Sequence, residues 1–162
     1  MSKRVRVSRE TATEIVGFFD EYRWLSNFYD AQATDLRGNT WPSVEHGYQA
    51  AKSSDPAYQA RIRVASYAGA AKRLGSRASI RPDWDDVRVQ EMLALVRSKF
   101  EDGDLCWKLL ATGAKTLIEE NDWGDTFWGR CNGRGTNMLG QILMHVRREL
   151  QQGKILEFKP TC

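Results

Sequence analysis

Residues 41–52 read Trp-Pro-Ser-Val-Glu-His-Gly-Tyr-Gln-Ala-Ala-Lys, a stretch that predicts a helix with a polar face beside an apolar one. Ser43 is a favourable N-cap residue and Pro42 lies just before it, so we expect the helix to cover 43–52. At about 100° per residue, three polar side chains share one face of this helix: Glu45, Gln49 and Lys52. The neighbouring apolar wedge is made of Val44, Tyr48 and Ala51.

The polar face of this helix has two interpretations. If it points into a cleft, Glu45 can donate or accept a proton, and Lys52 can hold an anion or attack a sugar aldehyde. If it points to solvent, it is one of the exposed Glu/Lys faces that are common on amphipathic helices, and it has no function. The spacing of the residues does not choose between the two.

Outward from this helix, the sequence predicts an α+β domain that is predominantly helical, with a small β-sheet or hairpins. Apolar and turn-forming residues predict a buried strand at 15–19, a loop at 21–27 and a hairpin at 34–41. Apolar spacing, caps and glycines predict further helices over 56–66, 68–74, 83–100, 104–112 and 138–152. Short strands are expected at 117–119 and 126–128.

Length and composition agree with one domain and exclude several classes of protein. The chain has 162 residues, is 41% hydrophobic and carries a net charge of +3. We expect a single domain over 15–162 after a basic N-terminal tail over 1–14. No apolar stretch approaches the roughly 20 residues of a membrane span, and no signal peptide is visible. With three scattered cysteines and no disulfide framework, these features favour a cytoplasmic protein without membrane partners.

The histidine content limits the chemistry. The two histidines, His46 and His145, form no zinc-binding pattern and leave little for a serine-type triad. We therefore expect no metal and no cofactor, with carboxylates and lysines carrying any acid–base work.

A second candidate site is the glycine-rich stretch 123–137, which precedes the last predicted helix. Asp125 lies among tryptophans such as Trp128, and a carboxylate desolvated by aromatic rings is suited to proton transfer. Glycines in this stretch, including Gly129, would let a ligand approach the backbone, and Asn137 is a natural helix cap. The alternative is a plain glycine-rich connection without function.

A third candidate is the loop Arg23-Trp-Leu-Ser-Asn-Phe-Tyr29, in which aromatic and polar residues alternate. Its aromatic side chains are suited to stacking on a flat ring. The alternative is that they plug the core, which is the commoner reason for aromatic residues in loops.

Six motifs follow one another along the chain. In order they are Leu25-Ser-Asn-Phe28, Trp41-Pro-Ser-x-Glu45-x-x-Tyr48-Gln49-x-x-Lys52, Arg81-x-x-Trp84, Asp125-x-x-Trp128-Gly129, Gly135-x-Asn137-x-Leu139-Gly140 and Leu143-Met144-x-x-Arg147. This ordered set resembles the NADAR family, also called YbiA-like. The resemblance spans about residues 15–150, nearly the whole chain.

The resemblance implies a small YbiA-like fold that hydrolyses N-glycosides of ribose without a metal or cofactor. Two substrates are associated with the family: phosphorylated ribosylaminopyrimidine intermediates of riboflavin synthesis, and ADP-ribose attached to guanine in nucleic acid. The implied partners are a small ribosyl phosphate or ADP-ribose, with ADP-ribosylated nucleic acid as a further candidate. Two other interpretations stay open: a non-catalytic module that binds ADP-ribose or a nucleotide, and a helical interaction domain whose polar faces are solvated.

The resemblance also implies roles for particular residues, which should converge around the anomeric carbon of a bound pentose. Glu45 and Asp125 would be the two carboxylates, one protonating the leaving group and one supporting the oxocarbenium-like state. Lys52 would neutralise phosphate or the departing group, or form a Schiff base with the opened sugar. The expected substrate-binding residues are Arg23, Asn27, Phe28, Trp41, Tyr48, Gln49, Trp128, Gly129 and Asn137. Of these, the stacking candidates are Phe28, Trp41 and Trp128, and the candidates for ribose hydroxyls or phosphate are Asn27 and Asn137.

Overall fold

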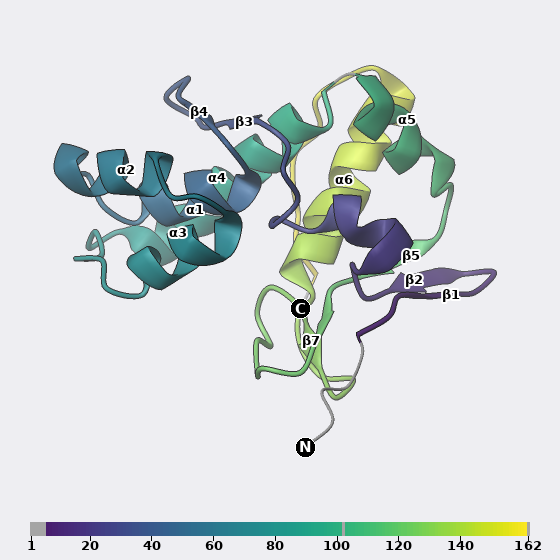
Figure 1. The fold of residues 1–162 in the computed structure, drawn as a ribbon. Helices are drawn as coiled ribbons and strands as arrows, with labels where there is room; N and C mark the ends of the chain where they lie inside the picture. The colour runs from purple at the N-terminus through teal and green to yellow at the C-terminus, as the bar shows by residue number, and fades with distance from the viewer. Residues whose placement is uncertain (1–5, 102, 162) are drawn as a thin grey trace. The chain divides into compact units, whose positions relative to one another are not determined.

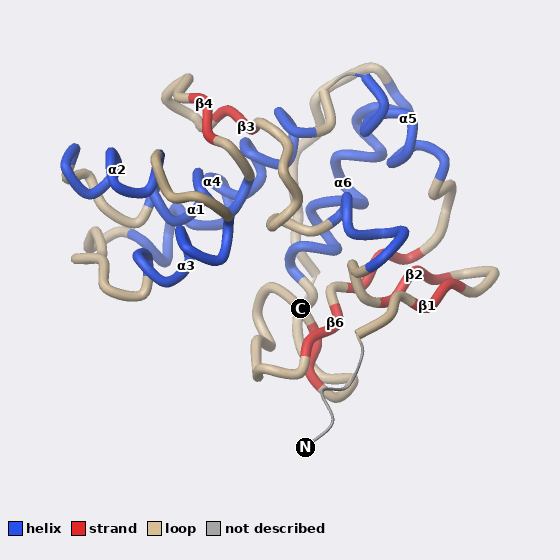
Figure 2. Tube along the Cα trace, in the orientation of Figure 1, coloured by secondary structure: helices blue, strands red, loops and turns tan. Residues whose placement is uncertain are grey.

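The structure is a computed structural model that describes residues 6–101 and 103–161 (Figure 1). Its contacts divide these residues into two compact units. The central unit is the continuous segment Asn27–Glu101, and the terminal unit combines the described residues of both chain ends, 6–26 and 103–161. Each unit is built around its own helices and short strands, as Figure 2 shows.

The central unit consists of a hairpin and four helices. Strands β3 (Ala33–Thr34) and β4 (Thr40–Trp41) pair antiparallel. The helices are α1 (Val44–Ala51), α2 (Pro56–Arg63), α3 (Ala68–Gly75) and α4 (Trp84–Lys99). Helix α1 packs against all three of the others (Figure 1), so every face of it is enclosed and all of its residues are buried.

The close packing of α1 on α4 depends on a residue without a side chain. A Cβ atom built on Gly47 would lie 2.4 Å from Cδ2 of Leu95, closer than atoms can approach without displacement. At the start of α1, the Ser43 side chain accepts a hydrogen bond from the His46 backbone N–H, as the sequence predicted for an N-cap. Cap and packing together fix the polar face of α1.

The terminal unit joins the two ends of the chain through a three-stranded sheet. Strand β2 (Glu14–Val16) lies between β1 (Arg9–Glu10), which is antiparallel to it, and β5 (Thr116–Ile118), which is parallel. The remaining elements of this unit are the 3-10 helix η1 (Asp20–Leu25), α5 (Gly103–Ala111), β6 (Glu120–Asn121), β7 (Arg130–Cys131) and α6 (Met138–Gln152). Helix α6 packs on β5.

The observed architecture confirms the predicted fold class, a mixed and mainly helical fold with small sheets. All six predicted helices and the hairpin are present, with ends shifted by a few residues. None of the described helices is long and apolar enough to cross a membrane.

Three local predictions are wrong. The expected loop at 21–27 contains η1, and the expected strand at 126–128 is irregular, with β7 beginning later at Arg130. The predicted tail over 1–14 includes β1, whose Arg9 and Glu10 pair with β2. The rest of that tail is described only from residue 6 onward.

Candidate functional site

The polar face of α1 is a buried hydrogen-bonded pair. The Gln49 Nε2 group donates to Oε1 of Glu45 at 2.7 Å, and the two residues are only 3% and 6% exposed. The backbone N–H of Glu45 donates to the carbonyl oxygen of Asn27 at 3.1 Å, which ties the predicted loop motif to the start of the helix. A solvated Glu/Lys face is therefore wrong for Glu45 and Gln49.

Lys52 lies at the end of the same face, and its surroundings change its acidity. Burial of the ammonium group lowers the pKa of Lys52 below its ordinary value of 10.5, and the Lys72 ammonium adds to this. The Glu45 carboxylate opposes both effects, which indicates that the three groups share one electrostatic environment. A lysine of this kind has more neutral, nucleophilic amine near neutral pH than an exposed lysine.

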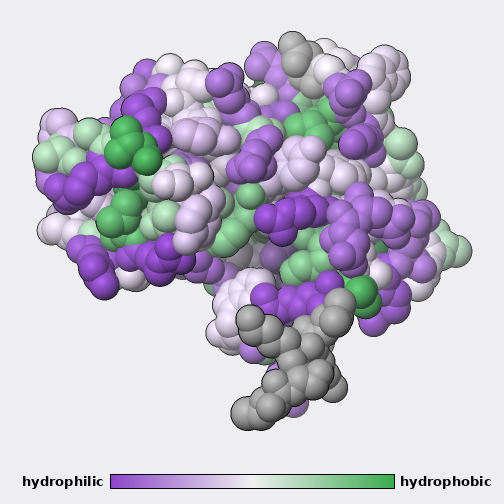
Figure 3. Space-filling view, in the orientation of Figure 1, coloured by the Kyte–Doolittle hydropathy of each residue, from purple (hydrophilic) through white to green (hydrophobic). Residues whose placement is uncertain are grey.

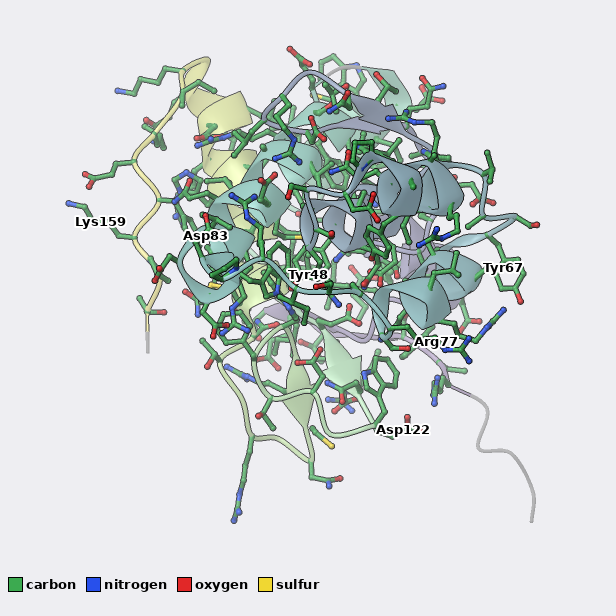
Figure 4. All side chains as sticks on the ribbon, turned by 90° about the vertical axis from the view of Figure 1, so that its left-hand side faces the viewer. Tyr48, Tyr67, Arg77, Asp83, Asp122 and Lys159 are labelled. Atoms are coloured by element: carbon green, nitrogen blue, oxygen red, sulfur yellow. The ribbon has the colours of Figure 1, made fainter. Side chains whose placement is uncertain are left out.

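Aromatic rings border these charged groups. The Lys52 Nζ atom lies 5.7 Å from the centre of the Tyr48 ring, and the Tyr48 ring packs on Trp84 with 5.0 Å between ring centres. The Lys72 Nζ atom lies 5.5 Å from the centre of the half-buried Phe28 ring. Figure 4 shows Tyr48 among the helices of this unit, whereas Tyr67 lies at its edge.

Two members of this cluster were missed as site residues by the sequence analysis. In the sequence, Trp84 was only a motif position, and Lys72 was not a candidate. Lys72 lies on α3, whose sequence neighbours carry no chemical motif, so its approach to Lys52 and Phe28 depends on the packing of α3 against α1.

Trp41 is not available for stacking on a base. Its side chain is 1% exposed, and its Nε1 group donates to Oδ2 of the buried Asp35 at 3.0 Å. The guanidinium carbon of Arg63 covers the ring at 4.0 Å from its centre. The prediction of a ligand-stacking Trp41 is therefore wrong, because the ring is enclosed by the hairpin and α2.

Asn27 contributes mainly through its backbone. Its side-chain Nδ2 group faces the sulfur of Met92 at 3.4 Å, a weak acceptor, while its carbonyl oxygen holds the α1 terminus. A role for its side chain in binding ribose stays a prediction.

In the terminal unit, Asp125 organises the loop that carries Trp128. Its Oδ1 atom accepts the backbone N–H groups of Phe127 at 3.1 Å and Trp128 at 2.9 Å. The side chain of Asn121 holds Asp125 from both sides, accepting from its N–H and donating to its carbonyl oxygen. The half-buried Trp128 ring packs edge-on against Phe127, with 4.9 Å between ring centres.

Two further predictions for this loop concern Asn137 and Gly129. Asn137 does not cap α6 with its side chain, because that amide donates to the Leu117 carbonyl oxygen at 2.9 Å and accepts from the Glu119 N–H at 3.0 Å. Both side-chain functions thus make hydrogen bonds within the fold, and a role for Asn137 in binding a ligand stays a prediction. At Gly129, a Cβ would lie 2.3 Å from the carbonyl oxygen of Glu119, so the fold itself requires a glycine there, and the approach of a ligand to Gly129 stays a prediction.

The predicted site residues thus fall into two groups. The central unit brings together Glu45, Gln49, Lys52, Tyr48, Phe28 and the backbone of Asn27. The terminal unit holds Asp125 with Trp128, and an exposed Arg23 on η1. Within the described ranges, no group of three or more His, Cys, Asp or Glu side chains is placed to hold a metal ion.

Comparison with known proteins identifies the family. The model of the NADAR domain matches residues 13–151. The chain belongs to the NADAR family. Among curated NADAR relatives, the chain is 38% identical over 152 residues to the N-glycosidase YbiA of Shigella flexneri serotype 5b, covering 90% of this chain and 94% of that protein.

Two other similarities agree with this assignment. The riboflavin biosynthesis protein VVA0006 of Vibrio vulnificus is 42% identical over 137 residues, which is 82% of this NADAR chain but only 37% of the Vibrio protein. The NMR structure of the Escherichia coli protein YbiA matches with a TM-score of 0.77 and 35% identity, over 90% of this chain and 89% of that one.

Proposed function

We propose that this NADAR protein is an N-glycosidase that hydrolyses the C1′–N bond of a phosphorylated ribosyl substrate. The observation that carries the proposal is the buried Glu45–Gln49 pair with Lys52 in the same electrostatic environment. Relatives of nearly the same length are named N-glycosidases.

Glu45 is suited to supporting positive charge at the sugar. A donated N–H and a nearby ammonium group both favour the ionised form of a carboxylate. Departure of the nitrogen leaving group builds positive charge at C1′, which an ionised carboxylate stabilises most strongly in a water-poor site.

Lys52 has two possible functions that differ in protonation state. As an ammonium group, it would bind a phosphate or protonate the leaving nitrogen; as a neutral amine, it would add to C1′ of the opened ribose and lose water to form a Schiff base. The lowered pKa of Lys52 favours the second function, because a larger fraction of this amine is neutral than in an ordinary lysine. The role of Asp125 as the second catalytic carboxylate stays a prediction from the sequence.

The substrate is proposed to be either a ribosylaminopyrimidine phosphate or ADP-ribose linked to guanine. The name of the Vibrio relative favours the metabolite. The charge of the central unit favours nucleic acid, because residues 56–82 contain no Asp or Glu but six cationic residues: Arg61, Arg63, Lys72, Arg73, Arg77 and Arg81. The visible surface over α2 and α3 mixes hydrophilic and hydrophobic side chains (Figure 3). Arg73 and Arg77 line a cavity of about 330 Å³ there.

A side-by-side turnover assay tests the proposed function. The protein is incubated with a ribosylaminopyrimidine phosphate, with ADP-ribosylated guanosine and with an ADP-ribosylated oligonucleotide, and released base is measured by chromatography. We expect Glu45→Gln to lower turnover by about 100-fold or more, with the exposed Glu157→Gln unchanged as control.

Three outcomes of this assay would contradict the proposal. The first is that no substrate releases base. The second is that Glu45→Gln turns substrate over at the wild-type rate, and the third is that a metal chelator abolishes turnover. Tight binding of ADP-ribose without product would instead identify a non-catalytic binding module. A steeper loss of turnover with salt for the oligonucleotide than for the nucleoside would identify the basic surface as part of substrate binding.

A further inference from the structure

We propose that Gly75, at the end of α3, is a positioning residue: the space left by its missing side chain holds the Gln49 amide, and that amide orients the Glu45 carboxylate. The inference rests on the proposed function in taking Glu45 as a catalytic group. Gly75 acts on Glu45 through Gln49 and supplies no chemical group of its own.

The first observation is the fit between Gly75 and Gln49. A Cβ atom built on Gly75 would lie 1.8 Å from Oε1 of Gln49, 2.6 Å from its Cδ and 3.1 Å from its Cγ. The clash therefore involves the whole end of the side chain and not only its outermost atom. Even a methyl group at this position requires the amide to move.

Backbone conformation does not explain a glycine at this position. Gly75 lies within α3, and its φ is not positive, unlike the glycines that end helices in the left-handed conformation. The helix continues through it to a C-cap at Ser76. A glycine inside a helix is less favourable than alanine by roughly 0.5–1 kcal/mol, so its value here lies in the space that it leaves.

The second observation is that Gln49 has little freedom to move elsewhere. Its side-chain Nε2 group donates to Glu45, its backbone carbonyl oxygen accepts from the Tyr58 hydroxyl at 2.8 Å, and the residue is 3% exposed. Its Oε1 atom is buried and, within the described part of the chain, has no hydrogen-bond partner. Packing against Gly75, and not a hydrogen bond, thus holds the oxygen end of the amide.

This packing determines the direction from which Glu45 receives its hydrogen bond. Catalytic groups must be held within about 0.5 Å of the productive position by neighbours whose own conformations are fixed. A side chain at position 75 would displace the amide, so the carboxylate would lose a donor that favours its ionised form. The effect reaches the reaction through the side chains of Gln49 and Glu45.

A double-mutant cycle tests the proposal, using Gly75→Ala, Gln49→Ala and the double variant. We expect each single variant to lower kcat at least about 10-fold with a smaller change in KM, because an oriented donor is lost. The double variant should be no worse than Gln49→Ala, because truncation of Gln49 removes the clash. The matched control is Gly69→Ala in the same helix, where the atoms nearest to a Cβ are those of the Tyr67 ring at 3.2 Å and the Arg73 guanidinium at 3.8 Å.

The pH profile separates positioning from a purely structural role. Loss of the donor makes Glu45 easier to protonate, so the acid limb of kcat should move to higher pH in Gly75→Ala and in Gln49→Met, which keeps the side-chain volume. Two results would overturn the proposal. One is a kcat in the double variant that falls by the product of the two single losses, and the other is an acid limb of kcat that stays at the wild-type pH in Gly75→Ala and Gln49→Met. If Gly75→Ala fails to fold, the proposal requires the double variant to fold, and failure of both would also overturn it.

A readout without turnover keeps this test distinct from that of the proposed function. Labelling glutamate side-chain carboxyl carbons with 13C allows the Glu45 titration to be followed by NMR. Gly75→Ala should shift this titration to higher pH, and Gly69→Ala should not. Absence of turnover in the wild-type protein would sink the proposed function, whereas an unchanged titration in Gly75→Ala would sink the positioning role.

Discussion

Lys52 shows how a position on a helix changes the chemistry of one side chain. An exposed lysine is almost wholly protonated near neutral pH, but burial lowers the pKa of Lys52 and Lys72 lowers it further, against the opposing Glu45 charge. The neutral amine therefore forms at lower pH than in a free lysine. As the pH rises through the lowered pKa, the nucleophilic fraction increases.

This protonation behaviour gives a test for covalent chemistry at Lys52. We expect borohydride to trap a sugar adduct on the enzyme, with a trapping rate that rises with pH and has a midpoint below 10.5. Mass spectrometry should detect the adduct in wild type and in the exposed Lys154→Met control, but not in Lys52→Met. An adduct that persists in Lys52→Met would exclude Lys52 as its carrier.

At single residues, the sequence was informative where function depends on helical spacing and uninformative where it depends on distant contacts. Glu45 and Gln49 lie four residues apart, so a helix alone brings them together. The burial of Trp41 requires Arg63 and Asp35, and the use of the Asn137 amide requires Leu117 and Glu119. No local pattern encodes those partners.

Helix α1 depends on its first turn as well as on its packing. Ser43 is fully buried; its hydroxyl accepts from the His46 N–H at 3.3 Å and hydrogen-bonds with His46 Nδ1 at 2.7 Å. Removing that oxygen leaves buried polar groups without partners. Because this turn carries Glu45, a loosened cap would affect both stability and the site.

We predict that Ser43→Ala lowers the free energy of unfolding by about 1–2 kcal/mol. Urea denaturation measures the effect, and Ser76→Ala is the matched control, because its exposed hydroxyl donates to the Arg73 carbonyl oxygen outside the core. The control should change stability by less than about 0.5 kcal/mol. Equal losses in the two variants would show that the cap does not stabilise α1 specifically.

Among the elements, caps, glycines and apolar spacing located every predicted helix, because these signals are local. The segment 126–128 was mistaken for a strand because its aromatic residues have high β-propensity. The structure instead bends this segment around Asp125, whose Oδ1 accepts two backbone N–H groups. Such side-chain-to-backbone bonds compete with strand pairing, and the sequence does not reveal which will prevail.

For the molecule as a whole, the notable feature is that residues far apart in sequence build the terminal unit. Strand β2 pairs with β5, so Ile15 lies opposite Leu117, whereas the central unit is one continuous segment. Pairing β2 with β5 closes a loop that contains the whole central unit, and closing a long loop carries an entropic cost. The sequence predicted a single domain, and the contacts define two units; cooperativity between them is a measurable property.

Native-state hydrogen exchange on two matched variants measures this cooperativity. Leu117 and Leu95 are both 0% exposed, one in each unit, and truncation of such a residue to alanine typically costs about 2–5 kcal/mol. We expect Leu117→Ala to lower the opening free energy of amides in β2, β5 and α6 more than in α1 and α4, and Leu95→Ala to do the reverse. Equal losses across all amides in both variants would show instead that the chain unfolds as one cooperative domain.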